Sequence, residues 1–416
     1  MSRAEGRAAS SADVVVIGAG VMGTWTALAA ARSGRSTLLL DALSPGDRRA
    51  SSAGETRIIR TAHGADRHYA AWSRTALDGW RRLEAASGER LFVPTGVLWL
   101  GRRGGDFERS SAETLGSLAV PHERLAAAEV RHRWPMLAVG DDEGGLFEPE
   151  AGLLRARRGV LVAVRAMVDA GGRVARGDVR PGRSAARRLI DVVATGGERH
   201  AGGVFVFACG PWLPGLFPRE LGGRIRVTRQ DVVFLRPPLG DRSFRPGALP
   251  AWVDWDAAMY GTPALDGHGA KVASDAYGPA FDPSSGRRLV DPRSIARARR
   301  YAARRLPGLS EAPVAGSRVC QYASTTDAHF VIDRHPGYDN VWLVGGGSGH
   351  AYKHGPVIGE RVVARLDGSP PAPDEARFRL DREAIVGSGY RPGAEAGAAA
   401  AEPAPAGADA AEGAGA

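Results

Sequence analysis

Cysteine is nearly absent from the sequence, which has 416 residues and only two cysteines, Cys209 and Cys320. Two thiols cannot build a disulfide framework, and disulfides persist mainly in oxidising compartments. This scarcity excludes a small secreted fold held together by disulfides and favours a reducing, cytoplasmic location. The length allows at least one large hydrophobic core, and two cooperating domains are expected.

Lysine is almost absent as well. Of the 55 lysines and arginines, only Lys271 and Lys353 are lysines, whereas average usage would give on the order of twenty. A GC-rich genome replaces lysine with arginine wherever any cation will serve. The two remaining lysines are therefore candidates for chemistry that a guanidinium cannot perform, with chance retention as the alternative.

Long apolar runs are also missing. The most apolar stretch near the N-terminus, residues 14–31, has the composition of a signal peptide, but three glycines divide it into a strand, a turn and a helix. No other segment could span a membrane, so we expect no membrane association. Large apolar residues do not occur after residue 391, which predicts a disordered tail over 386–416. A flexible N-terminus is predicted over 1–12.

Positive charge is in excess. The formal net charge of +9 is a property that many nucleic-acid-binding proteins share. The basic residues are nevertheless spread along the whole chain rather than gathered in one block with interleaved aromatic residues, so we expect no nucleic-acid partner. A non-enzymatic nucleic-acid-binding module is the alternative, and it would bind DNA with a strong dependence on salt.

A glycine-rich turn lies between a predicted strand and a predicted helix near the N-terminus. Its glycines are Gly18, Gly20 and Gly23, and Asp41 follows at the end of the next predicted strand. The glycines let the backbone approach a pyrophosphate at the helix N-terminus, while the acid accepts hydrogen bonds from ribose hydroxyls. The motif predicts a dinucleotide site but does not distinguish FAD from NAD.

Two later segments also run from a strand into a glycine-containing turn, residues 204–212 and 341–350. With the first motif, this threefold return of the chain to one sheet resembles the superfamily of glycine oxidase, D-amino-acid oxidase and sarcosine oxidase, which binds FAD. A helix N-terminus after the last glycines could stabilise negative charge on the flavin.

Four further motifs, in the expected order, make the sequence similar to the family of monomeric sarcosine oxidase, N-methyltryptophan oxidase and pipecolate oxidase over residues 13–385. They are residues 54–60 (GETRIIR), 147–152 (FEPEAG), 320–333 (beginning CQY and ending DAHFVID) and 347–353 (GSGHAYK). The resemblance implies an α/β fold with a Rossmann-type FAD-binding domain and a second, mainly antiparallel-sheet substrate domain. We expect the FAD-binding domain over 13–90, 150–220 and 320–385, and the substrate domain over 91–149 and 221–319.

The resemblance also implies how the flavin is held. Cys320 matches the cysteine that forms a thioether with the flavin's 8α-methyl carbon in this family. Arg57 is expected to support the flavin face. Gly347, Gly349 and Lys353 match the loop over the flavin. Cys209 lies in an apolar strand and is interpreted as a small buried side chain.

The family's catalytic positions are occupied mainly by cations. Arg60 and Lys353 match the pair that holds the substrate carboxylate, which needs charge-assisted partners in a desolvated pocket. Lys271 matches the lysine that assists electron transfer to oxygen, where a compact ammonium stabilises developing negative charge. Both lysines of the chain therefore coincide with catalytic positions of the family.

Four more residues complete the expected site. Tyr260 and Tyr322 match hydroxyls that line the substrate cavity, and His350 matches a histidine beside the flavin. Asp275 departs from the sarcosine oxidases, which have a histidine there, and resembles the imino acid oxidase of the nikkomycin pathway. It could accept an N–H hydrogen bond, act as a base, or be a solvated turn residue.

The predicted activity is that of an FAD-dependent oxidase of a small secondary, N-methyl or cyclic amino acid. Hydride passes to flavin N5, and oxygen reoxidises the flavin to give hydrogen peroxide. The alternatives are a biosynthetic imino acid oxidase similar to piperideine-carboxylate oxidase, a flavin dehydrogenase using another acceptor, and a nicotinamide dehydrogenase. We expect a monomer, with the amino or imino acid and O2 as small-molecule partners and no metal.

Overall fold

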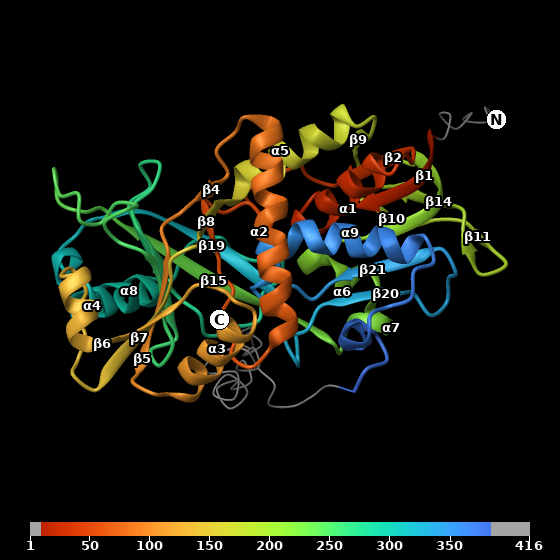
Figure 1. Ribbon diagram of the computed structural model, residues 1–416. Coiled ribbons are helices and arrows are strands. Elements are labelled where there is room, and N and C mark those ends of the chain that lie inside the picture. Colours follow the sequence, from red (N-terminus) through yellow and green to blue (C-terminus); the bar gives the residue numbers. More distant parts are fainter. Residues whose placement is uncertain (1–9, 384–416) are drawn as a thin grey trace, which may run out of the picture.

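The computed structural model describes residues 10–383 and is built around two eight-stranded sheets, seen on the right and left of Figure 1. No helix in that range is long and apolar enough to cross a membrane. The predicted tail, residues 386–416, lies outside the described residues, as do residues 1–9.

The first sheet is centred on three parallel strands, with β1 between β2 and β14. Its remaining strands extend both edges, and β10, β13 and β20 run antiparallel to their neighbours. The strands of this sheet are β1 (Ser10–Ile17), β2 (Thr37–Asp41), β9 (Arg173–Arg176), β10 (Val179–Pro181), β13 (Asp191–Ala194), β14 (Arg199–Phe207), β20 (Val331–Arg334) and β21 (Val341–Gly345).

Strand β1 is buried on both faces because helices cover both sides of the sheet. Val14 and Val16 pack with the core beneath the helices α1, α2, α5 and α9, whereas Val15 and Ile17 pack with residues of the short helices α6 and α7. This alternation follows from the two-residue period of a strand. The helices are α1 (Val21–Arg32), α2 (Arg67–Ser87), α5 (Ala156–Asp169), α9 (Gly355–Leu366), α6 (Leu213–Leu216) and α7 (Pro218–Leu221).

Helix α1 is the centre of this helical layer and packs against α5 and α9. The contact with α9 is close because Gly359 has no side chain: a Cβ atom there would lie 2.4 Å from the backbone oxygen of Trp25. The tight packing fixes the N-terminus of α1, where the glycine-rich turn lies.

The second sheet has the order β19-β15-β18-β17-β16-β5-β7-β6. All its neighbouring strands are antiparallel except β16 and β5, as the mainly antiparallel prediction requires. Its strands are β5 (Val97–Arg102), β6 (Glu123–Ala126), β7 (Glu143–Glu148), β15 (Ile225–Leu235), β16 (Ala251–Asp254), β17 (Met259–Thr262), β18 (Ala270–Ser274) and β19 (Val314–Thr325). The helices α3 (Asp106–Ser117), α4 (Ala127–Arg133) and α8 (Pro292–Arg305) accompany it.

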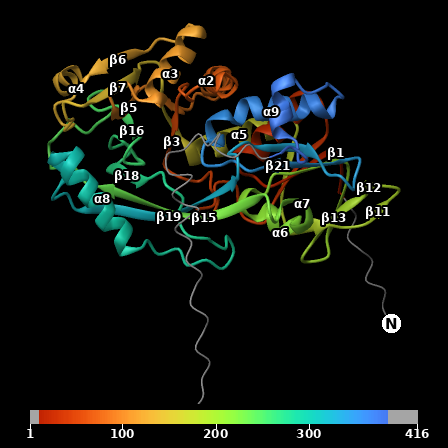
Figure 2. The same ribbon diagram turned by 90° about the horizontal axis from the view of Figure 1, so that it is seen from below.

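Strands β15 and β19 form a long antiparallel ribbon that reaches both halves of the molecule (Figure 2). At one end, Ile225 and Ala323 pack with the core of the first sheet. At the other end, Val233 and Leu235 pack with the core of the second sheet. The ribbon therefore ties the two cores together.

Two small sheets complete the described fold. One is the antiparallel pair of β11 (Ser184–Ala185) and β12 (Arg188–Leu189). The other has three strands. Its order is β3-β8-β4, with β3 at Thr56–Ile59, β8 at Gly152–Arg155 and β4 at Phe92–Val93. β3 carries the central residues of the predicted GETRIIR motif and pairs with β8 over its whole length.

Two details of the sequence prediction are wrong. First, residues 93–100 have the composition of one strand, but they are divided between β4 and β5, because Pro94 has no amide hydrogen and Gly96 has a φ of +67°. β1 begins at Ser10, three residues inside the segment predicted to be flexible, because Ser10 and Ser11 pair with β14. The domain boundaries stay a prediction, and the one at residue 320 falls inside β19.

Candidate active site

The glycine-rich turn has the geometry that a bound pyrophosphate requires. Gly18 has a φ of +105°, and a Cβ atom there would lie 2.4 Å from the carbonyl oxygen of Ala208. A Cβ atom at Gly23 would lie 1.9 Å from the carbonyl oxygen of Gly18, whereas one at Gly20 would meet only the Ser52 hydroxyl, at 3.4 Å. The first and last glycines thus permit close packing of β1, α1 and β14, and the middle one keeps the N-terminus of α1 open to a ligand.

Asp41 lies at the end of β2, beside this turn. Its carboxylate accepts hydrogen bonds from the amides of Ala19, at 2.5 Å, and Leu43, at 2.7 Å. Burial raises the pKa of the carboxyl group, and the two amide donors oppose that shift. The acid is therefore held at the glycine-rich turn, as a ribose-binding role requires.

Three adjoining cavities run from this turn to the second sheet. The nucleotide cavity, about 460 Å³, is lined by Gly18, Gly20, Asp41 and Cys209 among others. The middle cavity, about 100 Å³, shares Gly20, Ser51 and Ser52 with it and also contains Gly347 and Gly349. The inner cavity, about 90 Å³, shares Arg57, Cys320, Tyr322, Gly349 and Tyr352 with the middle one. This continuous path fits an elongated dinucleotide whose reactive end lies at the second sheet.

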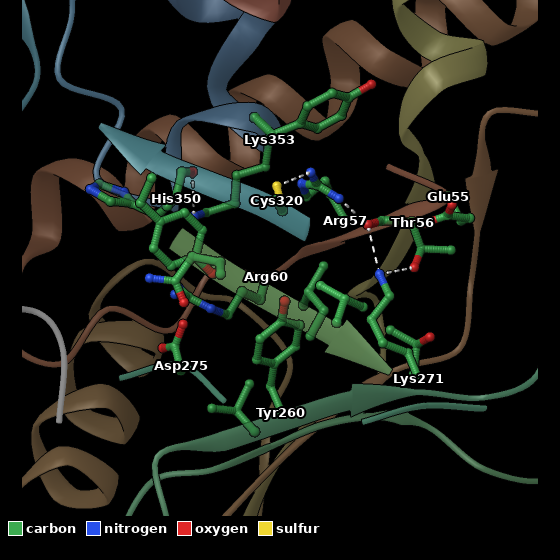
Figure 3. A pocket seen from close by; sticks show the side chains of 18 of the residues that line it. Glu55, Thr56, Arg57, Arg60, Tyr260, Lys271, Asp275, Cys320, His350 and Lys353 are labelled. Atoms are coloured by element: carbon green, nitrogen blue, oxygen red, sulfur yellow. Dashed lines mark hydrogen bonds between the residues drawn. The ribbon is translucent and has the colours of Figure 1, made fainter. Parts of the chain in front are cut away.

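All seven residues predicted to be catalytic line the inner cavity. They are Arg60, Tyr260, Lys271, Asp275, Tyr322, His350 and Lys353. Most of them are drawn in Figure 3, where the labelled side chains of β3, β17, β18 and the segment before α9 converge. The topology thus brings together residues that the sequence separates widely.

Lys271 is buried on β18 and contacts the small sheet. Its ammonium donates hydrogen bonds to the Thr56 hydroxyl at 2.6 Å and to the Thr56 carbonyl at 3.0 Å (Figure 3). Burial, followed by the charge of Arg57, lowers the pKa of Lys271 to about 7. The side chain can therefore change its charge near neutral pH.

Cys320 lies on β19 with its sulfur beside the guanidinium of Arg57. The distance from Arg57 Nη2 to Cys320 Sγ is 3.7 Å, and the same nitrogen donates to the carbonyl of Ser51 at 2.5 Å. Burial alone would lower the pKa of Arg57, but nearby Cys320 and the two cavity tyrosines raise it overall. Arg57 is thus a fixed cation at the junction of the middle and inner cavities.

Arg60 and Lys353 are both buried at the inner cavity. The Arg60 guanidinium donates to the Ala62 carbonyl at 2.7 Å and lies 4.7 Å from the ring centroid of Trp99. The Lys353 ammonium donates to the His350 carbonyl at 3.0 Å. Two cations, one directly after β3 and the other in the segment before α9, therefore line one small cavity.

Tyr260, Tyr322 and Asp275 are only partly buried. Burial, followed by the neighbouring Tyr322, raises the pKa of Tyr260 well above its ordinary value, so its hydroxyl stays protonated. Asp275 directly follows β18, and its amide donates to the carbonyl of Ala258 at 2.7 Å. Its position at the cavity argues against a purely solvated turn residue.

Three buried histidines, His63, His350 and His354, have ring nitrogens within 4.8 Å of one another. Burial, together with the charges of Lys353 and Arg60, lowers the pKa of His63 and His354 well below the ordinary value. The rings of His63 and His354 are therefore neutral, but the same two cations oppose a metal ion, and the cluster also lies at the positive N-terminus of α9. We therefore assign it no metal.

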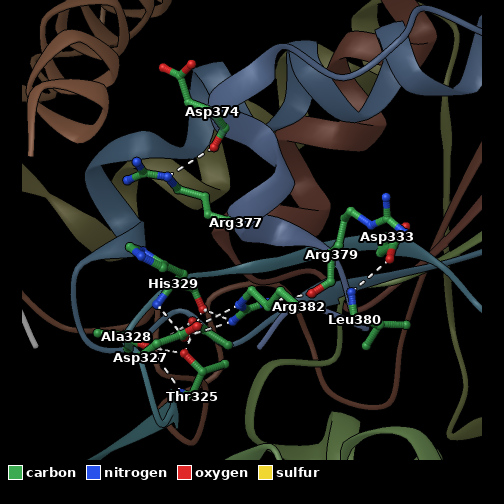
Figure 4. Close-up of polar contacts among 12 residues, drawn as sticks. Thr325, Asp327, Ala328, His329, Asp333, Asp374, Arg377, Arg379, Leu380 and Arg382 are labelled. Atoms are coloured by element: carbon green, nitrogen blue, oxygen red, sulfur yellow. Dashed lines mark hydrogen bonds and ion pairs between the residues drawn. The ribbon is translucent and has the colours of Figure 1, made fainter. Parts of the chain in front are cut away.

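The DAHFVID motif holds a downstream segment and supports His350. Asp327 forms an ion pair with Arg382 at 2.7 Å, and Asp333 accepts from the Leu380 amide at 2.8 Å (Figure 4). The carbonyl of Ala328, between them, lies 3.0 Å from Nε2 of His350. This motif thus reaches the inner cavity through a backbone group.

The sequence did not single out several residues at the cavity. Thr56 belongs to the GETRIIR motif, but nothing in that motif indicates a hydrogen bond to Lys271. Trp99, Trp255, Gln230 and Val253 also line the inner cavity. They lie in β5, β15 and β16 or directly after β16, and nothing in the local sequence of these segments indicates a ligand site.

Comparison with known proteins places these features in a family. The DAO family, described as FAD dependent oxidoreductase, matches residues 13–365. The chain is 31% identical to monomeric sarcosine oxidase of Streptomyces avermitilis, over 85% of this chain and 93% of the relative. It is 28% identical to N-methyl-L-tryptophan oxidase of Yersinia pestis, over 89% and 99% of the two chains.

Solved structures have the same fold at lower identity. L-proline dehydrogenase from P. horikoshii has a TM-score of 0.78 and 18% identity, covering 90% of this chain and 98% of that one. NikD, an unusual amino acid oxidase essential for nikkomycin biosynthesis, has a TM-score of 0.75 and 21% identity, covering 89% and 97%. The predicted α/β fold and family resemblance are confirmed: this chain belongs to the DAO family of FAD-dependent oxidoreductases, together with the sarcosine oxidases.

Proposed function

We propose that the protein oxidises a small secondary, N-methyl or cyclic amino acid with FAD and passes the electrons to O2. The observation that carries the proposal is the inner cavity, where Arg60 and Lys353 lie together with Lys271. Two cations fit a substrate carboxylate, and the third fits negative charge that develops during oxygen reduction. Monomeric sarcosine oxidase and N-methyl-L-tryptophan oxidase, to which the chain is similar, are named as oxidases.

The protein's contribution is orientation and electrostatics. Arg60 and Lys353 bind the carboxylate and so direct the carbon next to the substrate nitrogen toward the middle cavity, while the tyrosines and tryptophans of the wall exclude water. When bound, FAD supplies the two-electron chemistry: it accepts a hydride equivalent from that carbon, and its reoxidation by O2 yields H2O2. The substrate nitrogen releases its proton, and the product is an imine.

We also propose that FAD is attached through a thioether to Cys320. The new bond from sulfur to the 8α carbon replaces the thiol S–H bond and one methyl C–H bond, the two electrons pass to the flavin ring, and O2 reoxidises the ring and is reduced to H2O2. We propose further that the protein works as a cytoplasmic monomer. Cys320 lies where the middle and inner cavities meet and does not line the nucleotide cavity that contains Asp41. Arg57 beside its sulfur is a fixed cation that could stabilise negative charge on a flavin during attachment.

An oxygen-electrode screen tests the activity. N-methyl, cyclic and unsubstituted amino acids of both configurations are supplied to the purified yellow protein, and O2 uptake and H2O2 release are measured together. One mole of H2O2 per mole of O2 is expected with a secondary amino acid. A protein whose flavin is bleached by substrate but which releases no H2O2 would instead be a dehydrogenase with another acceptor.

Replacing either carboxylate-binding cation tests the anchoring model. Arg60→Met and Lys353→Met should each weaken binding of a carboxylate inhibitor such as acetate by about one to two decades, since a charge-assisted hydrogen bond contributes roughly 1.5–3 kcal/mol. Dissociation constants are measured from flavin absorbance. A wild-type preference for amines that lack a carboxylate would contradict the model.

Asp275 favours a cyclic imine or enamine as a second substrate class, because it could accept the N–H hydrogen bond or take up the proton. Asp275→Asn keeps the shape and removes the charge, so the rate of anaerobic flavin reduction by a cyclic substrate should fall. Stopped-flow mixing with substrate measures it. An unchanged rate would make Asp275 structural and favour sarcosine-like substrates.

A further inference from the structure

Glu148 is a deeply buried carboxylate next to the inner cavity and does not line it. It ends β7 in the FEPEAG motif, and only 1% of its surface is exposed. Glu150, two residues further on, is exposed. A buried carboxylate is costly unless several donors satisfy it, so its partners indicate what it is for.

All three donors to Glu148 belong to the surroundings of Arg60. One carboxylate oxygen accepts from the amides of Thr61, at 2.7 Å, and Ala62, at 3.1 Å. The other accepts from the indole nitrogen of Trp99, at 2.9 Å. Glu148 therefore holds both the two residues that follow Arg60 and the ring over which its guanidinium lies.

Arg60 is held by two groups that Glu148 itself contacts, the backbone of Ala62 and the ring of Trp99. Its Nη1 donates to the carbonyl of Ala62, whose own amide is bound by Glu148, and its guanidinium lies 4.7 Å from the Trp99 ring centroid. The hydrogen bond from its nitrogen to Glu148 helps to hold the indole in the orientation that offers this face. The Glu148 carboxylate also supplies a buried negative charge close to the buried Arg60 cation, as the opposing effects on its pKa indicate: burial raises that pKa, and Arg60 is among the groups that lower it.

We infer that Glu148 is a positioning residue that orients Arg60 and thereby sets the affinity of the site for the carboxylate of its substrate. The inference rests on the proposed role of Arg60 in binding that carboxylate. It assigns to the FEPEAG motif a function at the site, although Glu148 itself does not reach the cavity. We expect Glu148 to affect neither the oxidation of the substrate's reacting carbon nor the reaction of the flavin with oxygen.

The test compares Glu148→Gln with the exposed control Glu150→Gln. Acetate and its uncharged counterpart acetamide are titrated into the flavin-loaded proteins, and flavin absorbance gives the dissociation constants. Glu148→Gln should weaken acetate binding by about tenfold, the effect of one lost charge-assisted hydrogen bond, and acetamide binding by less than about twofold. Glu150→Gln should change neither. In kinetics, KM for the amino acid should rise while the limiting rate of anaerobic reduction is kept.

A double-mutant cycle separates this inference from the proposed function. In an Arg60→Met background, Glu148→Gln should add less than about twofold, because the group that it positions is gone. If Arg60→Met alone leaves acetate binding unchanged, the carboxylate anchor and this inference are both wrong. If Arg60→Met weakens binding but Glu148→Gln does not, only this inference is wrong. Equal losses for acetate and acetamide would also overturn it, since they indicate general disruption.

Trp99→Phe provides a second route if Glu148→Gln fails to fold. It keeps the carboxylate and an aromatic face but removes the indole N–H that fixes the ring. Acetate binding should weaken by about threefold, less than for the loss of Glu148, because the two amide hydrogen bonds remain. Unchanged acetate affinity in a fully flavinated Trp99→Phe protein would overturn the inference.

Discussion

Lys271→Met is expected to leave reduction of the flavin by substrate largely intact and to slow its reoxidation by O2 by a factor of about 10²–10³, the usual cost of removing one preorganised charge-stabilising group. Lys271 is buried, and its ammonium is held at the cavity by two hydrogen bonds to Thr56. It is thus fixed at the cavity where we propose that it stabilises nascent superoxide. Stopped-flow mixing with substrate under anaerobic conditions, and of reduced enzyme with O2, measures the two halves separately.

Lys353→Met is the matched control, because it removes the other lysine and should affect substrate binding instead of reoxidation.

The pH dependence of reoxidation gives an independent check on the role of Lys271. The pKa of Lys271 is lowered to about 7. The side chain is therefore fully protonated well below that pH and loses its positive charge as the pH rises through it. Negative charge on the reduced flavin beside the ammonium would raise the pKa of Lys271. The reoxidation rate should therefore fall as the pH rises, with a midpoint at pH 7 or above. A rate that increases over this range, or equal slowing of both halves by Lys271→Met, would contradict the role.

Cys320→Ala is expected to convert a permanently attached flavin into one that is released completely on denaturation. After acid precipitation, wild-type protein should keep its yellow colour in the pellet and have an intact mass that includes one FAD, whereas the variant should release FAD into the supernatant. The physical reason is that a thioether survives unfolding, while the contacts along the three cavities do not.

Cys209→Ala supplies the control for the second cysteine. Cys209 is not the buried strand residue that the sequence predicted: it follows β14, is half-buried, and lines the nucleotide cavity with Gly18 and Asp41. Its partial burial still raises the pKa of the thiol well above the ordinary value, which keeps it unreactive. This variant should behave like the wild type. Free flavin in the supernatant of fully loaded wild-type protein would rule out the covalent bond.

The sequence predicted the parts of the molecule that depend on local backbone requirements. The glycine turn needs Gly18 and Gly23 for close packing, and Asp41 needs only to follow the next strand, so spacing alone located them. The scarcity of lysine drew attention to Lys271 and Lys353, and the family resemblance supplied the remaining cavity residues. All seven lie at one cavity.

The rest depends on contacts between segments that are distant in the chain. Glu148 meets Thr61 and Trp99 only after β7, β5 and the end of β3 are assembled. Nothing in the local pattern separates Glu148 from the exposed Glu150. The same holds for Thr56 and Lys271, which are more than two hundred positions apart.

The β15–β19 ribbon limits how this enzyme can be recombined with its relatives. A chimera that exchanges the half containing the second sheet must place its junctions where the chain passes between the two sheets. At the ribbon, the chain passes from one sheet to the other within β15 and β19, which are paired with each other. A crossover within β19 would separate Val314 at one core from Ala323 at the other and would replace only part of the register with β15. Functional hybrids should therefore be recovered when both strands are inherited from one parent, whichever parent supplies the rest.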